Sequence, residues 1–344
     1  MNKKLLTLAV AAAMVAPLAV QAGNSGPTVY GVAHVSVENI DNDANNTDTW
    51  EVVSRQSRFG IKGEEDLGNG LSAVYKMEFQ IDMDDTAGNG ATSTTSNADN
   101  LTARNQYVGL AHKNMGTLLL GRHDSPMKFM TISRDQFNTK LGDWNEVTGN
   151  SGVTAPRDRR VSDAILYKSP NFNGFEAAAM VSPGESQTAD GLADGITSIG
   201  ARYVNGPIYV GAAWEESDFD TGVAGFDEET TWRVAASYDI AGFKVSGLYE
   251  DNEDVGGINV DGETWQLALS YKFGNTVVKG MYQEGEEDNI GAADDEYEAF
   301  AIGVDHHFSK RTQVYAVYTE TDDETSGANN NDVDAFGAGI IHKF

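Results

Sequence analysis

Apolar and polar residues alternate with a period of two along most of this chain. In the clearest run, Leu71–Met83, the odd-numbered residues are apolar or aromatic and most even-numbered residues are polar. Alternation of this kind predicts β-strands with one apolar face and one polar face. The run exceeds the usual soluble strand of about 5–6 residues and suits a tilted membrane strand of about 9–11 residues. Beyond residue 22, no stretch approaches the roughly 18 consecutive apolar residues of a membrane-spanning helix.

The connections between the expected strands alternate in length. About 16 strands can be read between residues 27 and 344. Short turns that carry Gly, Asn or Pro, such as Asn205–Pro207, alternate with long polar loops, such as 216–229. This rhythm is typical of outer-membrane barrels, which have short periplasmic turns and longer extracellular loops. The sequence therefore predicts an all-β fold, a transmembrane antiparallel β-barrel of about 16 strands.

The N-terminal segment predicts export. Lys3 and Lys4 precede an apolar run that ends at Val20-Gln21-Ala22, the pattern of a secretory signal peptide. We expect residues 1–22 to be removed and residues 23–344 to form a single barrel domain; a retained N-terminal anchor is the alternative. Losing the two lysines changes the net charge from −28 to −30, which argues against binding to nucleic-acid phosphates. The chain has no cysteine, so disulfides cannot stabilise it after export.

Four segments carry a more specific pattern. They are Ser57–Leu71, Asn105–Leu110 with Gly121-Arg122, Arg160–Phe175 and the closing His342–Phe344. Together they resemble the Gram-negative general porin family, the trimeric diffusion channels of the bacterial outer membrane. The first and third segments are the most specific, and the resemblance extends over the whole predicted barrel domain. It implies a homotrimer in the outer membrane, in contact with lipid and lipopolysaccharide.

The resemblance also implies a constriction. In the family, the third long loop folds into the barrel, and its acidic residues face basic residues on the wall. Here the third long loop, 124–158, is the longest. It carries an acid at the family's position. The residues expected at the constriction are Arg58, Arg104, Arg160, Asp135 and Glu78.

Alternation supports some of these positions independently of the resemblance. Arg58 alternates with the apolar Phe59, and Arg160 has the opposite parity to Ile165, so both are expected to point into the lumen. Glu78 lies on the polar face of its strand and is expected to do the same. Arg104 is different, because Val108 shares its parity and alternation alone does not turn it inward.

These features predict a water-filled channel for the passive diffusion of ions and small hydrophilic solutes. We expect a weak cation preference, because Asp135, Glu78 and the acidic loops oppose the three arginines. A channel of this kind is not an enzyme and needs no cofactor. Phe344, the last residue of the last expected strand, is interpreted as a signal for the barrel-assembly machinery.

Other functions fit the sequence less well. A barrel that acts mainly as an adhesion or phage-receptor surface stays open as the alternative, and a secreted β-sandwich is a weaker one. No Gly-x-Ser-x-Gly elbow is present, and none of the six histidines has zinc-like spacing with partners. Acidic runs such as Glu284–Asp288 and Asp322–Glu324 are interpreted as solvated surface. The alternative is that they bind divalent cations that bridge to lipopolysaccharide phosphates.

Overall fold

The computed structural model describes the chain from residue 26 onward, with gaps. Its described ranges are 26–43, 46–84, 101–145, 158–183, 195–218, 228–255, 260–288, 295–324 and 332–344. The predicted signal peptide, 1–22, lies outside them. No helix within these ranges is long and apolar enough to cross a membrane.

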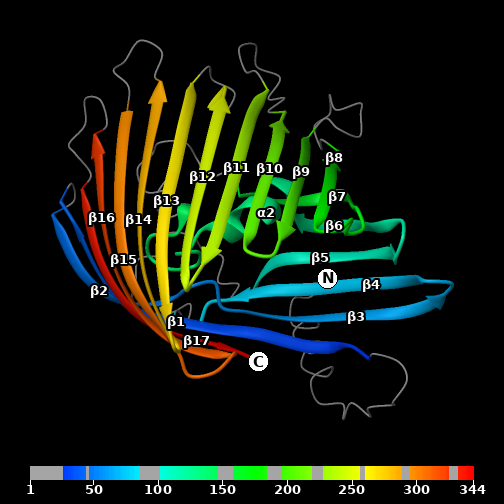
Figure 1. The fold of residues 1–344 in the computed structure, drawn as a ribbon, viewed down its shortest axis with the longest axis horizontal. Helices are drawn as coiled ribbons and strands as arrows, with labels where there is room; N and C mark the ends of the chain where they lie inside the picture. Colours follow the sequence, from blue (N-terminus) through cyan, green and yellow to red (C-terminus); the bar gives the residue numbers. More distant parts are fainter. Residues whose placement is uncertain are drawn as a thin grey trace, which may run out of the picture.

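The strands form one closed antiparallel sheet. The first half of the wall consists of β1 (Thr28–Asn42), β2 (Thr47–Ser54), β3 (Arg58–Gly68), β4 (Leu71–Ile81), β5 (Leu101–His112), β6 (Gly116–Asp124), β7 (Arg160–Lys168) and β8 (Phe175–Ser182). The second half consists of β9 (Ile196–Asn205), β10 (Ile208–Ser217), β11 (Glu229–Ile240), β12 (Phe243–Glu253), β13 (Asp261–Phe273), β14 (Thr276–Asp288), β15 (Asp295–His307), β16 (Thr312–Glu324) and β17 (Val333–Lys343). Neighbouring strands pair along the order of the chain, and β1 pairs with β17 to close the barrel (Figure 1). The predicted barrel is confirmed.

β2 and β3 are two parts of one wall strand. β1 pairs with β2 through residues 35–42 and with β3 through residues 28–32. The break falls at 55–57, where Gln56 adopts a φ of 53°. Ser57 bridges it, because its hydroxyl donates to the His34 carbonyl at 2.9 Å and accepts from the His34 amide at 3.0 Å. With this pair counted once, the 17 segments of the described chain make a wall of 16 strands, as the sequence predicts.

Side-chain exposure follows the alternation seen in the sequence. On β13, Leu267 and Leu269 are 54% and 50% exposed, whereas Gln266 is 2% exposed. On β4, Met77 is 46% exposed and its neighbour Glu78 only 4%. Apolar side chains therefore cover the outer surface and polar side chains point inward. This arrangement is the reverse of a soluble domain and is that of a wall between lipid and a polar lumen.

The loop between β6 and β7 folds into the barrel. It begins with α2 (Pro126–Thr131), followed by the short 3-10 helix η1 (Ile132–Arg134). The Ser125 hydroxyl caps α2 by accepting from the Lys128 amide at 3.4 Å. Pro126 occupies the start of the helix, where its missing amide costs no hydrogen bond. α2 packs against β9 and β10 on the inside of the wall (Figure 1).

The rest of the described loop follows the inner wall. Phe137 and Leu141 are buried against residues of β13–β17, including Tyr297. Trp144 is buried against Leu248 of β12. The described part of the β6–β7 loop therefore lines the inner wall from β8 round to β17.

Candidate functional site

Glu78 gathers three donors from three strands. Arg104 of β5 donates through Nε to Glu78 Oε1 at 3.0 Å. The Lys76 ammonium lies 3.0 Å from Oε2, and the Tyr30 hydroxyl of β1 donates to Oε2 at 2.8 Å. One carboxylate therefore orients two cations and a phenol. Because Lys76 and Arg104 outnumber Glu78, this group is positively charged as a whole.

A β-bulge turns Arg104 into the lumen. One residue of β4, Glu78, stands opposite two residues of β5, 104 and 105. The extra residue shifts the alternation along β5 by one position. Val108, beyond the bulge, is 58% exposed on the outer surface, so unbroken alternation would have placed Arg104 outside as well. The resemblance, and not alternation, is what named Arg104 as a constriction residue.

Arg58 and Arg160 lie on the same part of the wall. The Arg58 guanidinium donates to the Gln56 carbonyl at 3.1 Å. Arg160 lies 3.1 Å from Asp124, its ladder partner at the end of β6, and Asn105 donates to the same carboxylate at 2.6 Å. We call this group on β3–β7 the constriction arc. Its members are Arg58, Lys76, Glu78, Arg104, Asp124 and Arg160, four of which the sequence analysis named.

Asp135 is not part of the constriction arc, contrary to the sequence expectation. Its side chain is 6% exposed. Oδ1 accepts from the Phe137 amide at 2.8 Å and Oδ2 from the Trp144 amide at 3.0 Å, so both oxygens brace the backbone of the β6–β7 loop. Burial, followed by the neighbouring Asp143 carboxyl, raises the pKa of Asp135 to about 8. Asp135 therefore contributes little negative charge to the lumen at neutral pH.

Buried cations anchor the β6–β7 loop to the opposite wall. Lys140 lies 2.7 Å from Asp305 of β15, and Lys279 of β14 lies 3.2 Å from the other oxygen of that carboxylate. Lys279 also donates to the Gln136 carbonyl at 2.7 Å. Burial, and then the nearby Lys279, lowers the pKa of Lys140 to about 7. These contacts fix the loop that narrows the lumen.

Arg233 forms a second anchor that the sequence analysis missed. It is fully buried on β11 and pairs with Asp158, at the end of the loop, and with Glu250 of β12. The sequence did carry a signal for it. Arg233 stands between the apolar Trp232 and Val234, which are exposed on the outer face, so alternation points Arg233 inward. A buried cation at such a position needs a carboxylate partner.

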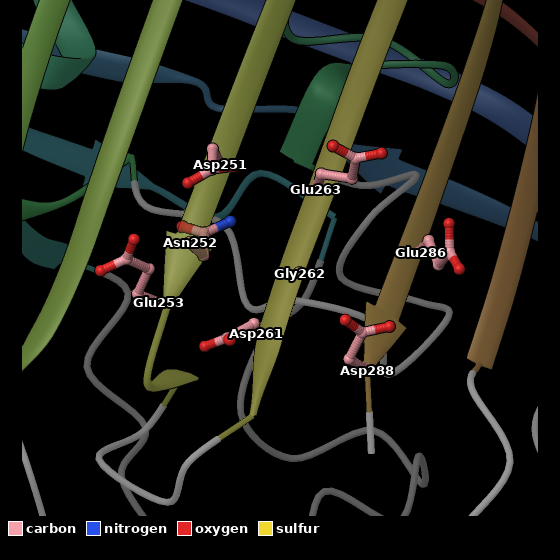
Figure 2. Close-up of a pocket in the computed structure, with 8 residues that line it drawn as sticks. All are labelled: Asp251, Asn252, Glu253, Asp261, Gly262, Glu263, Glu286 and Asp288. Carbon is pink, nitrogen blue, oxygen red and sulfur yellow. The ribbon is translucent and has the colours of Figure 1, made fainter. Parts of the chain in front are cut away.

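A second charged feature lies at the ends of β12, β13 and β14 that connect to long loops. A pocket of about 250 Å³ is lined by six carboxylates: Asp251, Glu253, Asp261, Glu263, Glu286 and Asp288 (Figure 2). Asp251 pairs in the ladder with Glu263, and Glu263 with Glu286. On β13, Asp261 and Glu263 share the parity of the lipid-facing Leu267, and their ladder partners on β12 and β14 lie on the same face, which is the outer side of the wall. Within the part of the chain that the structure describes, no cluster of His, Cys, Asp or Glu could hold a metal ion.

Comparisons with known proteins agree with this architecture. Residues 7–326 match the family described as Gram-negative porin. Outer membrane porin protein 32 of Delftia acidovorans is 29% identical over an alignment that covers 75% of this chain and 72% of that protein.

Two solved structures are similar in fold. The anion-selective porin from Comamonas acidovorans has a TM-score of 0.77 at 24% identity, covering 93% of this chain and 100% of that chain. The trimer form of OmpT from Vibrio cholerae has a TM-score of 0.70 at 16% identity, covering 93% of this chain and 100% of that one. With its closed 16-stranded wall, its inward-folded loop and a family match over nearly its whole length, the chain belongs to the Gram-negative porin family: it is an outer-membrane channel protein and not an enzyme.

Proposed function

We propose that the chain forms a water-filled channel for the passive diffusion of ions and small hydrophilic solutes, with a constriction that favours anions. The observation that carries this proposal is the charge of the constriction arc. Its cations are Arg58, Lys76, Arg104 and Arg160, and its carboxylates are Glu78 and Asp124. Four positive and two negative charges leave a net charge of +2 beside the narrowed lumen. Fixed charge at a narrow, wet site biases the flow of ions of opposite sign.

The described part of the β6–β7 loop adds no opposing acidic face. Between residues 125 and 145 its two acids are Asp135 and Asp143, and both are buried. Asp143 accepts bonds from the Thr139 and Asn145 amides. The weak cation preference expected from the sequence rested on Asp135, Glu78 and the acidic loops together, and the burial of Asp135 removes one of these three contributions. A similar solved structure is that of an anion-selective porin, which agrees with the proposed anion preference.

The six carboxylates of the pocket in Figure 2, which we call the acidic rim, add little to the charge that an ion meets at the constriction arc. They stand on the outer side of the wall, on the same face as lipid-contacting leucines. Charges separated from the lumen by more than a Debye length, about 8 Å at physiological salt, are largely screened. The net charge of −28 for the whole chain is therefore a poor guide to the charge that a permeating ion meets.

The chain also has features that bear on its oligomeric state and on its insertion into the outer membrane. We infer a homotrimer, as in the trimer form of the similar OmpT, held in outer-membrane lipid and lipopolysaccharide and delivered by the signal peptide 1–22. Phe344 pairs through its backbone with Gly31 of β1, while its ring is 54% exposed. An exposed ring on the closing strand suits recognition by the barrel-assembly machinery.

Planar-bilayer recording of the detergent-purified protein tests the channel function. Stepwise conductance increases are expected, with a reversal potential displaced toward the chloride potential in a KCl gradient. Replacing Asp135 with Asn should leave that potential unchanged, because its carboxyl is buried and bonded within the loop. A protein that inserts but carries no current would refute the proposal, and a large shift in the Asp135→Asn variant would show that this acid does face the lumen.

A further inference from the structure

Two lysines on neighbouring strands of the pore wall converge on one aromatic ring. Lys62 of β3 and Lys76 of β4 are direct partners in the ladder. Their ammonium nitrogens lie 5.2 Å and 5.7 Å from the centroid of the Tyr30 ring on β1. Like charges placed directly opposite each other destabilise an antiparallel pair. An aromatic face attracts cations, but it carries no net charge to compensate them.

The carboxylates nearby do not neutralise this group. Glu78 is within ion-pair distance of Lys76, but it also accepts from Arg104 and from the Tyr30 hydroxyl. Glu64 occupies the next inward position of β3. With the two nearby arginines included, the cations on this part of the wall are Arg58, Lys62, Lys76 and Arg104. Four positive charges against those of Glu64 and Glu78 leave a net charge of +2.

The lysine pair lies deeper in the channel than the arginines. Lys62 follows Arg58 by four residues on the same face of β3, a distance of about 13 Å at roughly 3.3 Å per residue. It lies toward the short turn at 68–71, and short turns mark the periplasmic end of such barrels. Lys62 is exposed, and the Lys76 side chain is 20% exposed. A solute that has passed Arg58 therefore meets both ammonium groups next.

We propose that Lys62 and Lys76, backed by the Tyr30 ring, form a second anion-binding station on the periplasmic side of the constriction. The ligand class is a small oxyanion with two negative charges, such as a phosphate group or a pair of carboxylates on a solute in transit. One such anion between the two ammonium groups removes their mutual repulsion and accepts hydrogen bonds from both. A monovalent halide does this less well. The inference rests on the proposed channel function, because the station is reached only through an open lumen.

The test measures block of chloride current by inorganic phosphate at pH 8, where phosphate is mainly divalent. Phosphate is added to KCl in the chamber on either side of a planar bilayer that holds wild-type channels, and the half-blocking concentration is recorded. Lys62→Gln should raise that concentration at least about fivefold, the factor that one unit charge contributes at contact distance in water. Lys62→Arg keeps the charge, so its half-blocking phosphate concentration should equal that of the wild type. Lys310→Gln, at an exposed turn residue, is the matched control and should also leave block unchanged.

The possible outcomes distinguish failure of the proposed anion-binding station from failure of the proposed channel function. A wild-type channel that prefers chloride but is not blocked by phosphate refutes the station and leaves the channel function standing. Equal half-blocking concentrations for wild type and Lys62→Gln refute it as well. Unblocked conductance in the same traces shows that each variant has folded. A protein that forms no channel at all would overturn the proposed function, and the station with it.

Discussion

Arg104 Nε donates to Glu78 Oε1 at 3.0 Å across a bulge in which one residue of β4 faces two of β5. The bulge aims the guanidinium into the lumen, and the carboxylate holds it there. Lys76 and Tyr30 both contact Oε2, the other oxygen of the same carboxylate. The wall of the pore is therefore a fixed array of charges rather than a set of independent, freely rotating side chains.

Replacing Glu78 with Gln should increase the anion preference. The substitution keeps the size of the side chain and removes one of two carboxylates from the constriction arc, which raises its net charge from +2 to +3 by the count above. One unit charge at about 8 Å in water changes the energy of an ion by about 0.5 kcal/mol, with opposite signs for chloride and potassium, so the chloride-to-potassium permeability ratio should change about fivefold. The reversal potential in a KCl gradient measures this ratio. Glu296→Gln, at an exposed carboxylate of β15, is the control; equal shifts in both variants would contradict a special role for Glu78.

The brace of the β6–β7 loop should weaken as the pH rises from about 4 to about 8. Burial and Asp143 raise the pKa of Asp135 to about 8, from an unfolded value near 4. A raised folded pKa contributes stability that is full below the unfolded pKa and is lost as the pH passes the folded pKa. Open-channel current noise should therefore increase between about pH 5 and about pH 8, because the loop fluctuates more.

The Asp135→Asn variant distinguishes the pH dependence due to the Asp135 carboxyl from that of other titrating groups. The lowered pKa of Lys140, about 7, changes loop stability in the opposite direction, since stability then increases with pH above that value. The variant removes only the carboxyl, so the increase in noise between about pH 5 and about pH 8 should disappear from it. Noise that rises equally in wild type and variant would assign the pH dependence to another group.

Gly31→Val should weaken closure of the barrel. Gly31 and Phe344 exchange two backbone hydrogen bonds of 3.1 Å each. A Cβ at Gly31 would lie 2.3 Å from Phe344 Cζ and 2.8 Å from the Arg58 carbonyl oxygen. The ring can move aside, but the Arg58 backbone cannot, and overpacking of this kind costs about 1–3 kcal/mol. Heat-induced change of gel mobility should occur at a lower temperature. Gly26→Val is the control, because nothing lies within 4 Å of a Cβ there.

Phe344→Ala should reduce assembly more than stability. The ring is 54% exposed, so its loss removes only part of the roughly 2–3 kcal/mol of a fully buried aromatic. The amount of protein in isolated outer membranes should decrease, while the gel-mobility transition of the assembled fraction stays close to that of the wild type. Phe308→Ala, at a ring that is 64% exposed, is the matched control. Equal outer-membrane yields for Phe344→Ala and Phe308→Ala would remove the assembly role.

The sequence predicts the wall better than the site, for physical reasons. Alternation identified the inward Glu78 and the outward Met77, because lipid on one side and water on the other leave each strand one allowed register. The bulge that turns Arg104 inward depends on an extra residue without a partner, and alternation cannot show it.

The loop was the harder part to predict. Asp135 was assigned to the lumen by resemblance, but which way a loop acid points depends on the amides near it. Phe137 and Trp144 present those amides only after the loop has folded. Arg233 shows the converse case, because its partner Asp158 lies 75 residues away in the chain and no local pattern connects them.

The reversal potential of the wild type beside that of the double variant Arg58→Gln, Arg160→Gln shows whether the constriction arc selects anions. It should be measured in KCl gradients at low and at high mean concentration, since salt screens the outer rim more than the confined constriction arc. An anion-selective constriction arc should give chloride preference in the wild type at both concentrations and the loss of that preference, or potassium preference, in the double variant. Potassium preference of the wild type at both concentrations would contradict anion selection by the arc.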